Sequence, residues 1–411
     1  MIKQIKQLFY FPVAQYFRFF ALIQLFFWKP KIIVITGSNS KTTLLHLLES
    51  QLGDRAIYSH QANSTYGIPF HILGLKRRTL LIWEWPLLFL LAPFNAFKTP
   101  PKEKIYVVEA DCDRPNEGKF LSTLLKPEVT LWPNSSNSHA VNFPNPASEN
   151  IAYEFGYFLQ NTSRLCIVNG DSALINSQLQ RVKCNVEKFT KKGHLQNYQL
   201  QKNGTTFKID NKIYNFKFLL PEESFYSIIF TLQILKYLNI KPETDFSNFT
   251  IPPGRSSIFN GLKNTTIIDS TYNATPSSMK VILEMFKKYP GINKWLILGD
   301  MVELGEEEQK EHEKLAISIN EIKSQQIILV GPRLSKFTFP KLNKSSIQQF
   351  DGPKEALDYI KSNIQGGEVL LLKGARFLEG IVEHLLANKS DVSKLCRREE
   401  IWIKRRKQWG L

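Results

Sequence analysis

The sequence predicts an α/β fold in two domains, each built around a mostly parallel sheet. Short apolar runs typical of buried strands alternate with longer helical patterns, as in parallel sheets covered by helices on both faces. The alternation stops at residues 251–255, where two prolines and a glycine break regular structure, and then restarts. With 411 residues the chain is also too long for one typical core. We therefore expect a central domain over 31–250 and a C-terminal domain over 251–390.

The central domain is expected to begin with a strand at 32–35 and a helix at about 42–52. Three more buried strands and a helix follow, at 104–108, 128–132, 164–168 and about 146–160. Polar residues stand at the carboxyl ends of these strands, which is where sheets of this kind bind ligands. Residues 186–219 resemble a small antiparallel patch, because short strand patterns alternate there with Gly, Asn and Asp turns, and a helix is expected at about 222–238.

A candidate phosphate-binding loop, or P-loop, follows the first strand. In residues 32–43 a buried strand leads through a Gly/Ser/Asn turn into a helix that opens with Lys41 and Thr42. In such a loop, backbone N–H groups face an anion, the lysine reaches the β- and γ-phosphates, and the threonine hydroxyl can bind Mg²⁺. The expected ATP contacts are Gly37, Ser38, Asn39, Ser40, Lys41, Thr42 and Thr43. The general spacing would need glycine at Ile35 and Ser40, so an ordinary strand-turn-helix junction with a surface lysine remains an alternative.

The C-terminal domain is predicted to be a Rossmann-like α/β unit, because the alternation of strands and helices restarts after the proline-rich break. Its strand segments are expected at 266–269, 294–300, 326–331 and 368–374. Its helices are expected at about 276–288, 306–320 and 353–364, with one more after the last strand. Residues 391–411 form a basic tail that includes the run Lys404-Arg405-Arg406-Lys407.

The N-terminal residues 1–30 are apolar and basic, and we treat them as a candidate for membrane-surface contact. Residues 8–28 hold ten aromatic side chains and one charge, and no acidic residue precedes Glu49. Polar residues and a proline interrupt this segment, which favours an interfacial helix over a bilayer span, while packing on the protein's own core is the alternative. A second apolar stretch at 80–97 contains Pro86 and Pro93, which argue against one long helix there.

Charge and cysteine usage limit the function classes. The chain has 53 basic and 37 acidic residues and a formal charge of +16, which suits phosphate-rich substrates, nucleic acid or an anionic membrane surface. No nucleic-acid-reading module accompanies the loop, so we expect no nucleic-acid partner. The four cysteines lie far apart without a C-x-x-C pair, which indicates neither a zinc site nor a disulfide framework and fits a cytoplasmic protein.

Several strand-end segments are similar to motifs of the Mur ligase family, ATP-dependent enzymes that form amide bonds in peptidoglycan synthesis. Residues 35–43 resemble its T-G-T-N-G-K-T-[ST] loop, a shorter form than the general P-loop, with Ser40 replacing the glycine before the lysine. A serine Cβ at that turn could crowd the phosphates. Residues 63–69 resemble the N-N-x-x-G-x-P segment, from which we assign Asn63 and Ser64 to the substrate side.

Two more segments of the central domain resemble the metal-binding motifs of the family. Residues 107–115 look like its E-x-G-x-x-x-P-G region, which implies that Glu109 is a Mg²⁺ ligand. Residues 134–143 resemble T-N-I-x-x-x-H-x-x-x-F, whose histidine helps to hold a second metal, and this implies the same role for His139. By the resemblance, the metal ligands are Thr42, Glu109 and His139, and the catalytic residues are Lys41, Glu109 and His139.

The C-terminal segments complete the resemblance, which covers roughly residues 31–385. The pair Gly254-Arg255 resembles the G-R-x junction, whose arginine approaches ATP, and residues 268–279 are close to D-D-x-Y-N-A-N-P-x-S-M. This implies nucleotide contacts for Arg255, Asp269 and Asn273. Residues 298–305 match L-G-D-M-x-E-L-G and 372–376 resemble V-K-G-S-R, so Asp300 and Lys373 are expected either to contact the substrate or to brace loops.

The implied reaction is the addition of D-alanyl-D-alanine to a muramoyl-peptide carboxylate through an acyl phosphate, with ATP and Mg²⁺. The expected partners are these peptide substrates and an anionic membrane surface, and the expected location is the cytoplasm, peripheral on the inner face of the membrane. Family members of this branch carry an N-terminal UDP-binding domain that we expect to be absent here. The alternatives are a ligase for a different or lipid-linked peptide acceptor, and a degenerate, non-catalytic membrane scaffold.

Overall fold

The computed structural model describes residues 9–77, 81–136, 140–375 and 377–411, which divide into two compact units. The first unit contains the residues up to Ser136 together with Asn142–Thr190 and Tyr226–Lys241. The second contains 140–141, Lys191–Phe225 and Pro242–Leu411. The predicted α/β class is confirmed in both units. The predicted boundaries divide the chain differently, chiefly because 191–225 belong to the second unit, and they stay a prediction.

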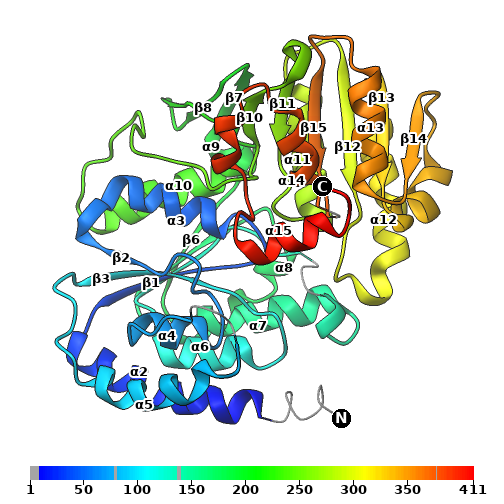
Figure 1. Ribbon diagram of the computed structural model, residues 1–411. Coiled ribbons are helices and arrows are strands. Elements are labelled where there is room, and N and C mark those ends of the chain that lie inside the picture. The colour runs from blue at the N-terminus through cyan, green and yellow to red at the C-terminus, as the bar shows by residue number, and fades with distance from the viewer. Residues whose placement is uncertain (1–8, 78–80, 137–139, 376) are drawn as a thin grey trace. The chain divides into compact units, whose positions relative to one another are not determined.

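The sheet of the first unit has six strands in the order β2-β3-β1-β4-β5-β6 (Figure 1). Their bounds are Lys31–Thr36 for β1, Ile57–Tyr58 for β2, Ile105–Ala110 for β3, Val129–Trp132 for β4, Leu165–Asn169 for β5 and Asn185–Phe189 for β6. Every neighbouring pair is parallel. The prediction for 186–189 was therefore wrong: this segment is not part of an antiparallel patch, because it continues the parallel sheet beside β5.

Helices cover both faces of this sheet. Their bounds are Lys41–Leu52 for α3, Gly67–Ile72 for α4, Glu117–Leu125 for α6, Ala147–Asn161 for α7, Ala173–Asn176 for α8 and Ser224–Tyr237 for α10. Figure 1 shows α3 and α10 on one face and α4, α6 and α7 on the other. In α7, Ile151, Phe155 and Phe158 are buried at helical spacing, so the apolar stripe of an amphipathic helix faces the sheet.

The predicted N-terminal helix is present as α2, Tyr10–Trp28. It packs on the first unit, because the Phe17 ring lies 4.7 Å from the Phe70 ring of α4 and the Trp28 indole donates to the Glu103 carbonyl at 2.6 Å. Arg18 also donates to the Phe120 carbonyl of α6. The inner face of α2 therefore has the core-packing role. Among the residues described, no helix is both long enough and apolar enough to span a bilayer.

The second apolar stretch forms helix α5, Glu84–Ala96, beside α2. We expected its prolines to prevent one long helix, and this was wrong. Pro86 lies in the first turn, where its missing N–H would have no intrahelical acceptor. Pro93 leaves the Phe89 carbonyl, four residues earlier, without its helical donor. The Tyr16 hydroxyl of α2 donates to that carbonyl at 2.7 Å, so a neighbouring helix supplies the hydrogen bond that proline cannot.

The second unit has a six-stranded sheet in the order β10-β11-β15-β12-β13-β14. Its bounds are Ser257–Asn260 for β10, Thr266–Asp269 for β11, Lys294–Gly299 for β12, Gln326–Val330 for β13, Ile347–Phe350 for β14 and Val369–Lys373 for β15. Only β10 runs antiparallel, against β11. The four predicted strands are confirmed at the centre of the sheet, while sequence reasoning missed the two edge strands.

Four helices cover this second sheet, and its core consists of two clusters of buried residues, each with side chains from two of the helices. Their bounds are Pro276–Lys288 for α11, Glu308–Asn320 for α12, Pro353–Asn363 for α13 and Leu378–Leu385 for α14. One cluster contains Phe286 of α11 and Leu315 of α12, and the other contains Ile360 of α13 and Ile381 of α14. Helix α11 begins with a capping box, in which Thr275 and Ser278 bond reciprocally.

The remaining elements of the second unit are a small sheet and the C-terminal helix. The strands β7 Leu195–Gln201, β8 Gly204–Ile209 and β9 Lys212–Phe216 form an antiparallel sheet, as the turn pattern predicts. The basic tail folds back through α15, Glu400–Lys407, because buried Arg406 donates to the Arg397 carbonyl at 2.8 Å and lies 3.7 Å from Glu379 of α14. Shorter helices are α9 Lys191–His194, η1 Gly53–Arg55, η2 Ala140–Asn142, η3 Leu179–Arg181, η4 Leu262–Asn264, η5 Gly305–Glu307, η6 Leu334–Thr338, η7 Phe339–Lys341 and η8 Lys389–Lys394.

Candidate functional site

The loop between β1 and α3 has the backbone that an anion cradle needs. Gly37 has φ +118°, and a Cβ there would collide with the Asn134 carbonyl oxygen, so both conformation and space require glycine. Ser38 exchanges hydrogen bonds with Ser136, donating to its carbonyl at 3.0 Å and accepting from its N–H at 2.8 Å. Asn39 donates to the Ser136 hydroxyl at 3.3 Å. The segment after β4 therefore braces the loop.

Ser40 lies immediately before α3 in the left-handed region, with φ 66° and ψ −4°. This conformation explains why the resembling motif has glycine there, because a Cβ costs about 1 kcal/mol in this region. The helix nevertheless begins at Lys41, so serine is tolerated. Thr43 lies in the first turn of α3, beside Thr42.

Lys41 is buried at 5% exposure, and its ammonium group makes an ion pair with Asp111 at 3.0 Å. It also donates to the Gly37 carbonyl. Burial by itself would lower the pKa of Lys41, but the carboxylates of Asp111 and Glu109 outweigh burial and hold the pKa above its ordinary value. Sequence reasoning missed Asp111, although an acid just past the end of β3, two positions after Glu109, was an available signal.

Thr42 and Glu109 form a pair of oxygen donors next to this lysine. The Thr42 hydroxyl donates to the two Glu109 carboxylate oxygens at 3.1 and 3.3 Å. Glu109 is buried on β3, and its backbone N–H donates to Ser59 at 3.0 Å. A hydroxyl and a carboxylate are hard oxygen ligands of the type that Mg²⁺ prefers, so this donor set fits the ion. The third predicted ligand, His139, lies outside the described residues.

The predicted substrate residues of the first unit lie beside this group. The Asn63 carbonyl accepts from the Asp111 N–H at 2.9 Å, which places residues 63–64 next to the acid that pairs with Lys41. The Ser64 hydroxyl accepts from the Gly67 N–H at 3.1 Å at the start of α4, so it has a structural partner. The first unit thus gathers the loop, Thr42, Glu109, Asp111 and Asn63, and the assignment of residues 63–64 to substrate stays a prediction.

A second group lies at the strand ends of the second unit. Lys373 ends β15, is buried, and donates to the Asn273 carbonyl at 2.5 Å and to its side-chain oxygen at 3.1 Å. Burial, reinforced by the Arg255 charge, lowers the pKa of Lys373 to about 7. Arg255 itself lies 4.6 Å from the centre of the Tyr272 ring. These residues come from three segments that are distant in sequence.

Asp269 ends the neighbouring strand β11 and is fully buried. Its Oδ1 accepts from the Thr271 N–H at 3.0 Å and from the Thr271 hydroxyl at 2.7 Å. Its Oδ2 is buried and has no hydrogen-bond partner among the described residues. Burial, with a contribution from Glu379, raises the pKa of Asp269 to about 6. A buried carboxylate oxygen without a donor is a candidate ligand-binding atom.

Asp300, at the end of β12, braces loops. Its Oδ1 accepts from the backbone N–H groups of Arg333 and Leu334 at 3.1 and 3.0 Å, and its carbonyl accepts from Ala375 at 3.1 Å. The Arg333 guanidinium lies 3.4 Å from Oδ2. These contacts favour the bracing alternative given for Asp300, and its contact with substrate stays a prediction.

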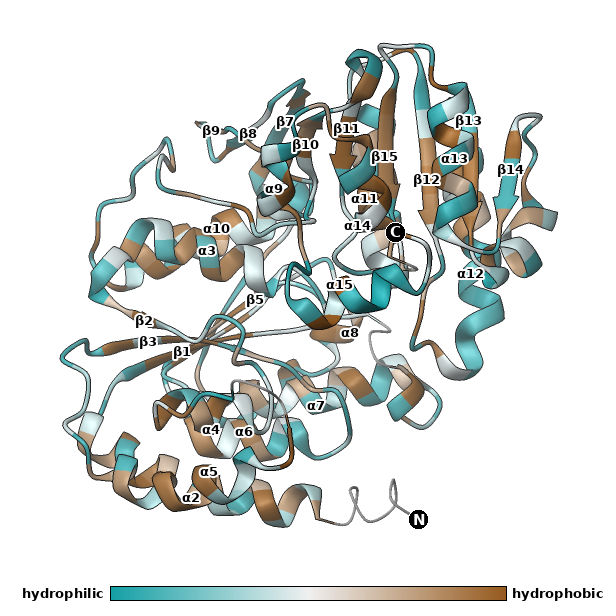
Figure 2. Cartoon of the chain, in the orientation of Figure 1, coloured by the Kyte–Doolittle hydropathy of each residue, from teal (hydrophilic) through white to brown (hydrophobic). Residues whose placement is uncertain are grey.

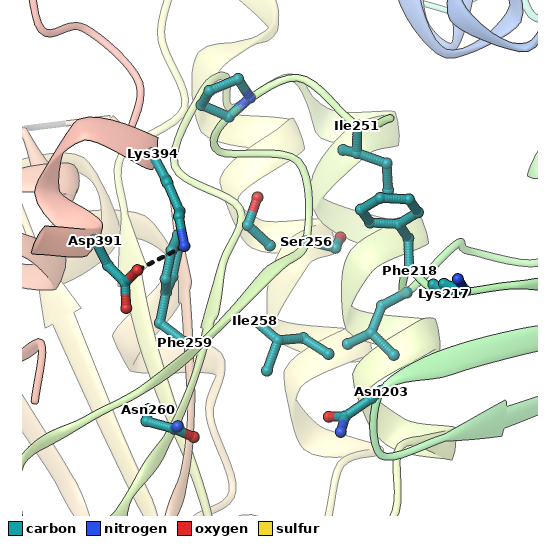
Figure 3. A pocket seen from close by; sticks show the side chains of 13 residues that line it. Asn203, Lys217, Phe218, Ile251, Ser256, Ile258, Phe259, Asn260, Asp391 and Lys394 are labelled. Atoms are coloured by element: carbon teal, nitrogen blue, oxygen red, sulfur yellow. Dashed lines mark hydrogen bonds and ion pairs between the residues drawn. The ribbon is translucent and has the colours of Figure 1, made fainter. Parts of the chain in front are cut away.

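A pocket of about 640 Å³ lies elsewhere in the second unit (Figure 3). Its wall includes Phe218, Ile251 and Ile258. Its charged residues are Lys217, Asp391 and Lys394, of which the last two pair with each other at 2.8 Å. None of the predicted site residues lines it. The pocket therefore adds nothing to the two strand-end groups.

Comparison with known proteins finds one family along the chain. The description "Mur ligase middle domain" matches residues 35–225, and "Mur ligase, glutamate ligase domain" matches residues 254–376. The UDP-N-acetylmuramoyl-tripeptide–D-alanyl-D-alanine ligase of Bacillus subtilis is 26% identical over 379 residues, covering 87% of this chain and 76% of that protein. The enzyme of the same name from Rickettsia prowazekii is 26% identical over 370 residues, covering 85% and 76%.

Solved structures show the same fold. A MurF ligase from Thermotoga maritima in complex with ADP superposes with a TM-score of 0.73 at 20% identity, covering 93% of this chain and 84% of that one. A MurF from Acinetobacter baumannii gives a TM-score of 0.74 at 20% identity, covering 90% and 79%. At this identity the likeness shows the fold alone.

Proposed function

Because the chain belongs to the Mur ligase family, we propose that it is an ATP-dependent ligase that adds D-alanyl-D-alanine to the carboxylate of a muramoyl peptide. The curated relatives that match most of its length carry the name of this activity. The observation that carries the proposal is the arrangement at the start of α3, where Lys41 is buried beside Asp111 and Thr42 pairs with Glu109.

The loop residues would hold the phosphates of ATP. The Ser38 N–H donates to the Asn134 carbonyl at 3.1 Å, so the N–H groups of Ser40 and of the first turn of α3 would face the phosphates. Lys41 would exchange Asp111 for phosphate oxygens. Thr42 and Glu109 would hold Mg²⁺, with His139 as the predicted additional ligand. When bound, the ion supplies positive charge against the phosphates. The raised pKa of Lys41 keeps the lysine cationic at neutral pH, as this role requires.

The reaction has two steps. A substrate carboxylate oxygen attacks the γ-phosphorus of ATP, and ADP leaves, which forms an acyl phosphate. The amino group of D-alanyl-D-alanine, after losing a proton, attacks the acyl carbon, and inorganic phosphate leaves as the amide forms. Lys41 and the loop N–H groups act on the charge that is transferred in the first step. Positioning and electrostatics supply most of the catalysis in such transfers.

The second unit would complete the nucleotide and substrate contacts. We propose that Arg255, Asp269 and Asn273 contact the nucleotide and that Lys373 and Asp300 lie toward the substrates. The buried Oδ2 of Asp269 and the hydrogen bonds between Lys373 and Asn273 support such a role. A lysine with a pKa near 7 is partly neutral at neutral pH, and its amine can donate hydrogen bonds in either protonation state.

We also propose that the enzyme acts in the cytoplasm, peripherally on the inner face of the membrane. The exposed apolar side chains of α2 and α5 support this association. An enzyme at that surface would be close to lipid-linked peptide, so a lipid-linked acceptor is the alternative substrate to test.

Phosphate release from ATP and Mg²⁺ tests the proposal, with UDP-muramoyl-tripeptide and D-alanyl-D-alanine supplied together and singly. We expect release only when both are present, loss of release in Lys41→Ala, and no loss in Lys212→Ala, which changes an exposed lysine of β9. Release that requires a lipid-linked peptide in place of UDP-muramoyl-tripeptide would reassign the acceptor. ATP binding without release under any pairing would favour the non-catalytic scaffold.

A further inference from the structure

Helices α2 and α5 present an apolar face to solvent. Half of the large apolar side chains that are exposed among the described residues lie between Phe9 and Phe97. On α5 and its flanks, Trp83, Leu87, Leu90, Phe94 and Phe97 are 58% to 82% exposed. Their spacing of three or four residues places them on one side of the helix. Figure 2 shows α2 and α5 as largely hydrophobic helices.

The outer side of α2 continues this face. Phe19, Phe26 and Phe27 are 49% to 68% exposed. The two helices lie side by side and run in the same direction, because Tyr16 packs on Phe89 at 4.9 Å and Phe27 lies near Phe97 at 6.3 Å between ring centres. We call the five side chains of the α5 region and these three of α2 the apolar face.

The helices are firmly attached through their opposite sides. Leu88 and Ala92 of α5 and Ala14, Phe17 and Ala21 of α2 are buried. The Trp28 indole and the Tyr16 hydroxyl donate to main-chain carbonyls at 2.6 and 2.7 Å. The apolar face is therefore presented by packed helices, and a helix that is apolar on both sides is unusual at a water-exposed surface.

Positive charge borders the apolar face at one end, and acidic residues are nearly absent from the two helices. The chain has no acidic residue before Glu49 and none between Glu84 and Glu103. Both helices end on the same side of the face, where the exposed residues Lys29, Lys31, Lys98 and Lys102 follow them. An apolar surface with aromatic residues and a lysine rim complements an anionic lipid bilayer, whose phosphates lie above the acyl chains.

We propose that the apolar face of α2 and α5 is a monotopic docking surface that seats the first unit on an anionic lipid bilayer. The aromatic and leucine side chains enter the boundary between headgroups and acyl chains, and the lysine rim contacts lipid phosphates. The inference rests on the membrane association proposed above and is independent of the ligase reaction, because no residue of the apolar face belongs to the strand-end groups.

Vesicle cosedimentation with the full-length protein tests the inference. We expect binding to vesicles of phosphatidylcholine with phosphatidylglycerol, and weaker binding to phosphatidylcholine alone. Leu90→Gln with Phe94→Gln should lower the partition coefficient by roughly tenfold or more, since two apolar side chains that would enter the bilayer are lost. Ile292→Gln with Ile317→Gln is the matched control in the second unit, where the side chains are 95% and 63% exposed, and it should bind like the wild type.

The charge contribution has its own variant. Lys29→Gln with Lys98→Gln should weaken binding to the anionic vesicles by about fivefold for each lysine, and raising the salt concentration should reduce this difference. The fluorescence of exposed Trp83 gives a second readout, which needs no substitution in the core. The fluorescence of the wild type should shift to shorter wavelength on anionic vesicles, and Trp83→Phe should lose most of that shift.

Four results would overturn the proposal. Binding that survives in the Leu90 and Phe94 variant, or that falls equally in the control, would show that the apolar face is not the contact. A wild type that stays off both vesicle types would do the same. A dimer in sedimentation velocity that the Leu90 and Phe94 variant abolishes, without vesicle binding, would assign the face to a second copy. Phosphate release measured in solution is the separate test of the ligase.

Discussion

Lys41 at the start of α3 in the first unit and Lys373 at the end of β15 in the second unit are both buried, yet their charges are set in opposite directions. Lys41 has carboxylate neighbours, Asp111 and Glu109, which hold its pKa above the ordinary value despite burial. Lys373 is buried near Arg255 and hydrogen-bonded to the neutral Asn273, and its pKa falls to about 7. Burial therefore leaves a permanent cation where carboxylates are the neighbours and an amine that titrates near neutrality where they are not in direct contact.

The largest effect expected from this comparison is the loss of the permanent cation. Lys41→Ala removes the charge that would meet the transferred phosphate and leaves Asp111 without its partner. We expect the rate of substrate-dependent phosphate release to fall by about 10³-fold, as when a preorganised charge is removed from a transfer site. Lys212→Ala should keep the wild-type rate. If Lys41→Ala releases phosphate at a rate within tenfold of the wild-type rate, Lys41 is not the cation on which the transfer depends.

The pH dependence of stability should distinguish the second lysine. A lowered pKa means that the unfolded chain binds the proton more tightly than the folded protein does. The unfolding free energy therefore rises as the pH increases from about 7 toward 10.5, and this contribution of Lys373 is lost as the pH falls back through 7. The slope can reach ~1.4 kcal/mol per pH unit in that window. Lys373→Met should lack this slope in urea denaturation at pH 7, 8 and 9.

Two controls sharpen that experiment. Lys212→Met changes a solvent-exposed lysine and should keep the wild-type slope. Lys373→Met also leaves the Asn273 oxygens without a donor, which should lower stability by about 1 to 3 kcal/mol at every pH and is therefore separable from the slope. Parallel curves for wild type and Lys373→Met would mean that Lys373 stays charged in the folded protein.

A smaller effect is expected when the metal side of the first unit is altered. Glu109→Gln keeps the shape of the side chain but removes the charge that faces Thr42 and would hold Mg²⁺. We expect the Mg²⁺ concentration for half-maximal phosphate release to rise by about 10- to 100-fold, with the rate recovering at high Mg²⁺. Asp54→Asn, at an exposed acid, should leave the Mg²⁺ dependence unchanged. An unchanged dependence in Glu109→Gln would place the ion elsewhere.

The smallest effect concerns the backbone that presents Lys41. Ser40 holds a left-handed conformation, so Ser40→Gly should raise the unfolding free energy of the first unit by about 1 kcal/mol. Ser40→Ala keeps the Cβ and should bring no such gain, which makes it the matched control. Urea denaturation followed by a probe in the first unit measures both. Equal stability of the glycine and alanine variants would show that Ser40 is unstrained.

Much of the fold followed from local pattern, and the exceptions have physical causes. The central strands are long apolar runs, and these were predicted. The edge strands β2, β10 and β14 were missed because they are short and half exposed, so they carry little apolar signal. The prolines of α5 misled the prediction because the hydroxyl that replaces the lost hydrogen bond comes from Tyr16, in another helix.

The sequence by itself determined the family, the loop and the polar residues at strand ends, because each is encoded in a short continuous segment. Only the tertiary structure decided what surrounds them: Asp111 lies 70 residues from Lys41, and Asn273 lies 100 residues from Lys373. It also decided that one side of α2 and α5 is buried while an equally apolar side faces outward. The pKa of a buried group and the exposure of an apolar one depend on neighbours that the sheet register and helix packing supply, which no local pattern contains.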